Sequence, residues 1–523
     1  MASTGKEAPE QSITELARAR TPARSLLAEW FGIDPRSLAL WRIGVSLVLL
    51  IDLGTRLQDF HAMYSDQGLL PLELAQAFWG ETPRWSLFFL HPSDGWAMTL
   101  FVVGVACAIA LLVGWRTTLA AIGCWGIMLS IHVRQPLVDS TGDWLLHLLL
   151  FWSMFTPMGR CWSLDARRNG LGDSRPVVSV GAACLLLQVC VMYWCAAYWK
   201  LNEVWATGEA LQFAFRFHNL ARPLAAVLLP YTGLLKLMTT SSLLLEAIGP
   251  LLLFSPWHPK MLRLLVALAF IVFHLTIEAT LAIGWFSYLC ALAWCLFLPD
   301  FVWQNRWWRL AVGAEVPRPA KETTDQLSVM QTGRMAASVF CGGCFAMVLI
   351  WNLGGMFRPI AVATPGSINI ACYRLGLTQA WVMFSEPPVL SWWYVAEAEL
   401  ADGRVLDLLR RDPTDGEPVT LDLPSRLPSH YRRARWRQLG IELYTAPEPQ
   451  RFQQRTAEFL AEEWNAAHPS GQQVVTLRMH QMELPSRPSH DTGQVSRIVA
   501  TVDTGESAAA PLPSLLDLQD QGF

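Results

Sequence analysis

One lysine, Lys200, stands inside a cluster of aromatic residues that runs from Tyr193 to Trp205 at the end of a long apolar stretch. Ionisable side chains at membrane depth are costly, so each one indicates a function by default. Burial in apolar surroundings favours the neutral amine, and a neutral amine can act as a base. The structural alternative is a lysine that extends along the aromatic residues to the lipid headgroups.

Three further ionisable residues, Arg42, Asp52 and Arg56, share the first apolar stretch. Asp52 and Arg56 are four residues apart, so they lie on the same face of a helix. Opposite charges within a membrane segment are least costly when they pair with one another. We therefore predict that Arg42, Asp52 and Arg56 form a structural ion pair.

Later apolar stretches add four polar groups, which are Asp143, His147, Glu246 and His274. Asp143 opens its stretch, where a carboxylate either caps a helix or contacts a ligand. His147 lies one turn further on the same face, and a buried core histidine is the alternative to a role in a site. Together these residues predict a polar pocket within the membrane.

Motifs of other chemistries are not found in the sequence. It contains neither an H-E-x-x-H zinc motif, nor a phosphate loop of the G-x-x-x-x-G-K type, nor a serine nucleophile elbow. Cys341 and Cys344 have a spacing that suits redox chemistry or a metal, although small residues in a span more often serve close helix packing. We predict no metal site, and the sequence disfavours hydrolase and ATPase functions.

The composition is that of a polytopic membrane protein. Of the 523 residues, 52% are hydrophobic and only 16% are charged. Apolar runs of roughly 17 to 25 residues, the length that crosses a bilayer, predict about nine transmembrane helices. They lie near residues 38–53, 96–113, 117–133, 143–158, 176–199, 241–255, 261–281, 283–303 and 335–356.

The distribution of basic residues predicts the orientation of these helices. Lysines and arginines gather in the N-terminal segment and after every second span, and this side is expected to be cytoplasmic. Nine spans then place the C-terminal part on the extracytoplasmic face. The first thirty residues show no removable signal peptide. The expected partner is the lipid bilayer, and the net charge of −3 gives no indication of nucleic acid.

The chain is expected to have four parts. A disordered cytoplasmic N-terminus covers residues 1–30, the transmembrane domain 31–357, an extracytoplasmic domain 358–485 and a disordered tail 486–523. In the third part, Ala401-Asp402-Gly403 predicts a hairpin turn between two strands. Residues 447–467 predict an amphipathic helix and 474–484 a further strand. The predicted fold is an all-α polytopic membrane domain followed by a small α+β extracytoplasmic domain.

Several of these motifs, taken in order, resemble the vitamin K-dependent γ-carboxylase family and its bacterial HTTM-domain relatives. The resemblance extends over roughly residues 30 to 480. Its motifs are Arg42…Asp52…Arg56, Trp162-Ser-Leu-Asp165, Tyr198-Trp-Lys200-Leu-Asn-x-x-Trp205-x-x-Gly208, Phe273-His274, Ile283-Gly-Trp-Phe-Ser-Tyr288, Gly376-Leu-Thr-Gln379-Ala-Trp381 and Arg432-Arg-Ala-Arg-Trp436.

The resemblance implies a carboxylating lyase that uses a reduced quinone, either vitamin K or a menaquinone. In that family a lysine at the position of Lys200 is the base that deprotonates the reduced quinone. The anion then reacts with oxygen, and the strong base so formed allows a glutamate in an exported peptide or protein to capture carbon dioxide. The residues expected to bind the quinone or the substrate are Asp143, His147, Trp199, Trp205, His274 and Tyr288.

One departure from the family pattern affects this expectation. The animal enzymes place a histidine after two asparagines where this chain has Thr141-Gly142-Asp143. An acid there disfavours a nearby anion unless the acid is protonated or paired. The alternative function is therefore a non-catalytic quinone-binding or scaffold protein that retains the fold.

Overall fold

The computed structural model describes residues 22–168, 175–304, 327–486 and 493–504. Within these residues, seven helices are long and apolar enough to cross a membrane. The protein is therefore a multi-pass membrane protein. The seven are α3 (Pro35–Gln58), α6 (Asp94–Val113), α7 (Thr117–Arg134), α10 (Val180–Trp199), α14 (Thr232–Leu252), α15 (Pro259–Thr280) and the part of α19 (Leu327–Met356) that begins at Met335.

The predicted count of nine spans is not confirmed. Two of the predicted spans, 143–158 and 283–303, correspond to α8 (Thr141–Ser153) and α16 (Trp285–Trp294), which have 13 and 10 residues. Helices of that length are too short for the bilayer core, which needs about 20 residues. Almost every side chain of α8 is buried, so this helix lies inside the bundle.

Helix α14 begins at Thr232, well before the predicted start at residue 241. The polar run from Thr239 to Ser242 interrupts the apolar pattern, which explains why the start of the helix was predicted too far along the chain. In the structure the hydroxyls of Thr239 and Ser242 donate to carbonyl oxygens of the preceding turn. Such bonds satisfy a hydroxyl within a helix, so the helix continues through the polar residues.

Short helices precede, connect and follow the spans. They are α2 (Pro22–Phe31), α4 (Phe60–Tyr64), α5 (Leu72–Trp79), α9 (Leu164–Arg168), α11 (Glu203–Ala206), α12 (Ala210–Arg216), α13 (Pro223–Leu228), α17 (Asp300–Trp303), α20 (Arg358–Ala363) and α21 (Gly366–Leu375). Short 3-10 turns lie at Leu87–Leu90, Pro136–Val138, Cys295–Phe297 and Ser470–Gln472.

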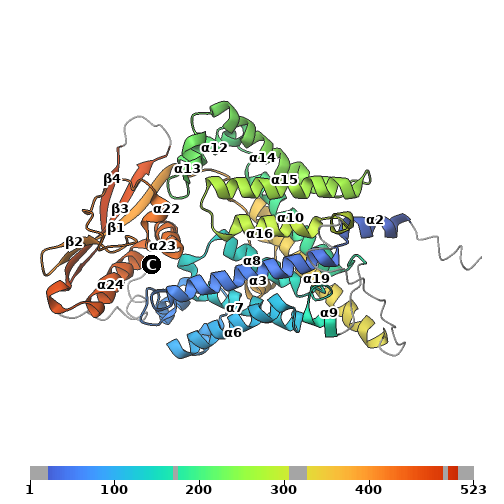
Figure 1. The fold of residues 1–523 in the computed structure, drawn as a ribbon, viewed down its shortest axis with the longest axis horizontal. Coiled ribbons are helices and arrows are strands. Elements are labelled where there is room, and N and C mark those ends of the chain that lie inside the picture. The colour runs from blue at the N-terminus through green and yellow to red at the C-terminus, as the bar shows by residue number, and fades with distance from the viewer. Residues whose placement is uncertain (1–21, 169–174, 305–326, 487–492, 505–523) are drawn as a thin grey trace, which may run out of the picture.

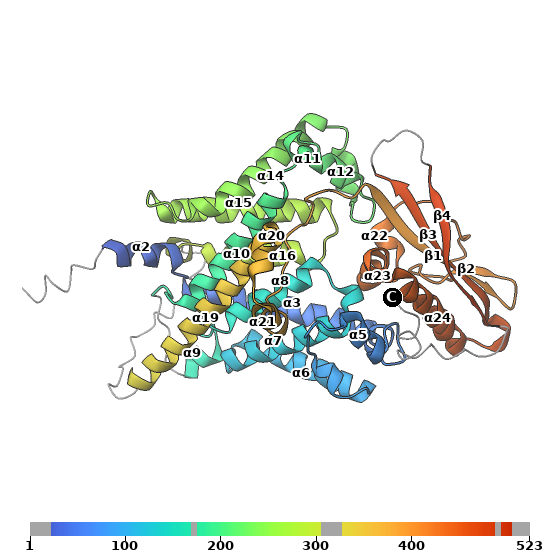
Figure 2. The same cartoon turned by 180° about the vertical axis from the view of Figure 1, so that it is seen from behind.

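The C-terminal part forms an antiparallel four-stranded sheet in the order β2-β1-β3-β4. Its strands are β1 (Leu390–Leu400), β2 (Val405–Asp407), β3 (Val474–Pro485) and β4 (Val495–Asp503), and its helices are α22 (Leu427–His430), α23 (Ala434–Thr445) and α24 (Pro449–Ala467). In both views the sheet lies at one end of the helical bundle, with α23 and α24 on its bundle side (Figures 1 and 2).

The sheet confirms the predicted hairpin, since β1 and β2 pair on either side of Gly403. The predicted end of the domain at residue 485 is wrong, because β4 lies within the stretch expected to be a disordered tail and pairs with β3. Its β-branched residues favour a strand. Residues 1–21, 487–492 and 505–523 lie outside the described residues, so most of the predicted N-terminal segment and the last part of the predicted tail do too.

Candidate functional site

Lys200 follows the last residue of α10 and is only 6% exposed. Its Nζ lies 2.5 Å and 2.6 Å from the two carboxylate oxygens of Glu246 on α14. The ring of Trp205 lies beneath the same ammonium group, 4.8 Å from Nζ to the ring centroid. Lys200 therefore does not extend to solvent, and its polar partner is a carboxylate from another membrane helix.

The pair faces a cavity of about 260 Å³ that is mostly apolar. A third polar group on its wall is His274 of α15, whose Nε2 lies 2.5 Å from the hydroxyl of Tyr193. That hydroxyl also accepts a hydrogen bond of 3.0 Å from Trp294 Nε1. The cavity thus combines an acid–amine pair and an imidazole with apolar walls from α10, α14 and α15.

Of the predicted binding residues, Trp205 and His274 line this cavity beside Lys200. Trp199 lines a different cavity. The helical repeat explains the difference, because Tyr193 and Ala196 share the face of α10 that continues to Lys200, whereas Trp199 is turned about 100° away from Lys200. A run of aromatic residues along a helix therefore cannot all contact one ligand.

Asp143 and His147 belong to a separate buried group. Arg56 donates to Asp52 at 2.8 Å and to Asp143 at 2.6 Å. Arg435, which enters from α23, donates to Asp143 at 2.7 Å and also contacts Asp52. Asp143 is therefore a paired acid, with two arginine partners. Its Oδ2 also accepts from the Ser140 backbone nitrogen at 2.7 Å, which corresponds to the helix-cap role, one of the two roles considered for Asp143.

Arg42 does not join Asp52 and Arg56, so its inclusion in the predicted ion pair is wrong. Its guanidinium donates to the carbonyl oxygens of Leu111 at 2.7 Å and Trp162 at 2.5 Å. Ten residues of helix separate Arg42 from Asp52, about 15 Å along the axis. This distance places Arg42 at the other end of α3.

A second, larger cavity of about 680 Å³ lies between the membrane helices and the C-terminal domain. Asp139, Tyr288, Arg435 and Glu442 are among its lining residues, so Tyr288 lies here and away from Lys200. Burial raises the pKa of Glu442 to about 7. The two cavities share four wall residues, Ile283, Phe286, Met383 and Phe384. An apolar cavity and a charged cavity therefore adjoin.

The sequence alone did not reveal the partner of each charge. The run from Arg432 to Arg437 is explained from sequence either as a grip on an acidic substrate or as a solvated helix face. The structure shows Arg433 bonded to Asp59 at 2.5 Å and Arg435 only 8% exposed. One feature of the sequence could have indicated this role: Asp52 and Asp143 lie at membrane depth, where carboxylates need cationic partners.

The sequence pattern of the HTTM domain matches residues 31–303, just over half of the chain. The matched range contains Lys200, Glu246 and His274 of the apolar cavity. It ends before α19 and the C-terminal domain. No curated protein matches the chain. No solved structure matches it either.

Proposed function

Because this chain belongs to the HTTM domain family, we propose that it is a membrane enzyme of the vitamin K-dependent carboxylase-like kind. In this proposal the Lys200–Glu246 pair is the base that acts on a reduced quinone, and an exported substrate is modified. The observation that carries the proposal is the 2.5 Å pair of Lys200 and Glu246 on the wall of an apolar cavity.

The residues of the apolar cavity suit a quinone ring. Its volume of about 260 Å³ lies just below the ligand-pocket range of roughly 300–1,000 Å³. It therefore has room for a ring but not for an isoprenoid tail. Residues of α14 and α15 line the cavity, and both helices carry exposed apolar side chains such as Leu237 and Val272. A tail that leaves between them reaches the lipid.

A bound reduced quinone would supply the electrons for chemistry with oxygen. The chain's own residues receive and hold the proton. An amine and a carboxylate 2.5 Å apart pass a proton between them, so the base is Lys200 and Glu246 together rather than a lone amine. His274 lies on the same wall as a further polar contact, and Trp205 and Phe286 exclude water.

The adjoining charged cavity is proposed to hold the substrate group. It lies against the C-terminal domain, and it shares four wall residues, Ile283, Phe286, Met383 and Phe384, with the apolar cavity of the base. In the proposed orientation the N-terminus is cytoplasmic and the C-terminal domain extracytoplasmic, so an exported peptide or protein reaches this cavity. Arg435 does not bind the substrate in this proposal, because Asp52 and Asp143 already engage it.

Quinone epoxide formation tests the proposal. Detergent-purified protein receives reduced vitamin K or reduced menaquinone with oxygen, and the epoxide is measured by chromatography. Lys200→Ala leaves Glu246 buried and unpaired, so the double variant Lys200→Met/Glu246→Leu is measured beside it as a pair-free protein. Lys260→Ala is the matched lysine control, because the side chain of Lys260 is 55% exposed.

The proposal expects epoxide from the wild type and from Lys260→Ala, and at least about 100-fold less from both Lys200 variants, the usual size of a general-base contribution. Equal epoxide from the wild type and the Lys200 variants refutes the base. If the wild type binds menaquinone but forms no epoxide, the protein is the non-catalytic quinone-binding or scaffold member of the family.

A further inference from the structure

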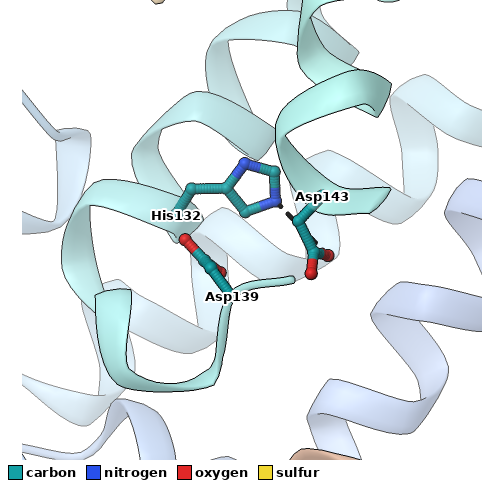
Figure 3. A group of neighbouring side chains, drawn as sticks. All are labelled: His132, Asp139 and Asp143. Atoms are coloured by element: carbon teal, nitrogen blue, oxygen red, sulfur yellow. Dashed lines mark ion pairs between the residues drawn. The ribbon is translucent and has the colours of Figure 1, made fainter. Parts of the chain in front are cut away.

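Three buried side chains converge where α7 is joined to α8. They are His132 near the end of α7, Asp139 after the turn Pro136–Val138, and Asp143 in the first turn of α8. One ligand atom from each lies within 4.8 Å of the others. Figure 3 shows the imidazole of His132 directed toward Asp143, with the Asp139 carboxylate beside the same ring.

A chain of hydrogen bonds determines which nitrogen of His132 carries its proton. His147 Nε2 lies 2.7 Å from the carbonyl oxygen of Gly376, and a carbonyl only accepts, so this nitrogen donates. In the neutral ring His147 Nδ1 is then an acceptor, and its partner at 3.3 Å is His132 Nδ1. His132 Nδ1 therefore donates, and His132 Nε2 presents a lone pair.

That lone pair faces an oxygen that also lacks a proton. His132 Nε2 lies 3.7 Å from Asp143 Oδ1. This separation is longer than any of the hydrogen bonds described above and is too long for one. It is right for two ligands of one metal ion, because metal–ligand bonds of about 2.0–2.2 Å leave neighbouring ligand atoms between 3 and 4 Å apart.

Asp139 is the second buried side chain that points to a ligand at this place. Neither of its carboxylate oxygens accepts a hydrogen bond from the described residues, although the side chain is only 2% exposed, and its nearest charged contact is Arg56 Nη2 at 3.8 Å from Oδ1. His132 Nε2 has no hydrogen-bond partner there either. Buried polar atoms without hydrogen-bond partners are rare and costly, and a bound ion is a recognised explanation.

The balance of charges around the site also favours a bound cation. Asp52, Asp139 and Asp143 supply three carboxylates, whereas Arg56 and Arg435 supply two guanidinium groups. The two arginines donate to Asp143 and so orient one of the carboxylates, as partners of metal ligands commonly do. His147 orients the His132 ring in the same way, through the hydrogen bond between their Nδ1 atoms.

We propose that His132 Nε2, Asp139 and Asp143 Oδ1 bind a first-row divalent transition metal ion of the zinc class. One imidazole nitrogen with two carboxylate oxygens is a donor set for such an ion, whereas calcium and magnesium prefer oxygen alone. Asp139 also lines the charged cavity, which gives the ion an entry path and leaves a coordination position open to that cavity. This site does not depend on the proposed quinone chemistry.

Metal analysis of tag-free protein tests the site. The full chain in detergent is treated with a chelator, equilibrated with Zn²⁺ by dialysis, and analysed for metal content and zinc affinity. The variants are His132→Phe, which fills the ring volume without a ligand, and Asp139→Asn, which keeps the shape. His480→Gln is the matched control, because His480 is a buried histidine of the sheet domain.

The proposal expects about one zinc per chain in the wild type and in His480→Gln, and at least tenfold weaker binding in both site variants. Wild type that binds no stoichiometric zinc overturns it, as do site variants that bind zinc like the control. If a variant fails to fold, the X-ray absorption spectrum of zinc-loaded wild type decides. A nitrogen and oxygen shell with one imidazole supports the site, and sulfur ligands assign the zinc to cysteines and refute it.

Discussion

Arg435 Nη1 donates to Asp143 Oδ2 at 2.7 Å, although 292 residues separate them in the chain. The guanidinium of an α23 residue thereby enters a group of acids that belongs to the membrane helices. Its other terminal nitrogen contacts Asp52 of α3. The contact ties the C-terminal domain to the bundle, and it makes Asp143 a member of an ion-pair network instead of an isolated acid.

Removal of Arg435 is expected to destabilise the protein strongly. Arg435→Ala leaves Asp52 and Asp143 with one buried cation between them, and breaking a buried pair costs about 3–5 kcal/mol. Thermal unfolding in detergent measures the loss. The control is Arg478→Ala, because the side chain of Arg478 is 41% exposed in its pair with Glu397 and such pairs contribute about 0–1 kcal/mol. Equal losses in the two variants would refute this role.

The Lys200–Glu246 pair is expected to show strong coupling in a double-mutant cycle. Glu246→Leu or Lys200→Met alone leaves a buried charge without its partner, which lowers the free energy of unfolding by about 3–5 kcal/mol. The double variant replaces both charges with apolar side chains, which is often neutral for stability. Thermal unfolding of the four proteins should therefore show single variants that are less stable than the double variant. Additive losses would mean that the two charges do not interact.

The hydroxyl of Tyr193 is expected to stabilise the apolar cavity. It is hydrogen bonded to His274 Nε2 and to Trp294 Nε1, and Tyr193→Phe leaves both nitrogens buried without this partner. The expected loss is about 1–3 kcal/mol in the free energy of unfolding. Tyr231→Phe is the matched control, since Tyr231 is 61% exposed and its change should be close to neutral. A stability of Tyr193→Phe equal to that control would contradict the role.

Glu442 is expected to make stability depend on pH. Burial raises its pKa from 4.5 to about 7, so the folded state binds the proton more tightly than the unfolded chain. Below about pH 4.5 the carboxyl is protonated in both the folded and the unfolded state, and it does not lower the free energy of unfolding. As the pH rises from about 4.5 to 7, the free energy of unfolding falls by roughly 3 kcal/mol for a pKa shift of this size.

The readout for Glu442 is the difference in unfolding temperature between the wild type and Glu442→Gln, measured from pH 5 to pH 8. Other acids titrate equally in both proteins, so the difference isolates Glu442. The wild type should lose stability relative to Glu442→Gln as the pH rises. A difference that stays constant over this range would show that the carboxyl titrates normally.

The sequence by itself determined the local features of this protein. Long apolar runs predict most of the spanning helices, since a helix needs about 20 such residues to cross a bilayer. Gly403 in the turn predicts the β1–β2 hairpin, and the pattern of Phe452, Phe459 and Trp464 predicts the buried face of α24. Lys200, as an ionisable residue at a helix end, indicated a polar site near the membrane.

Only the tertiary structure decided which charges meet. Glu246 reaches Lys200 from another helix, and Arg435 reaches Asp143 from another domain. Hydrophobic periodicity marks the buried face of one helix, but it does not fix how two helices are rotated and shifted relative to each other. That relative placement also brought His132 of α7 beside Asp143 of α8.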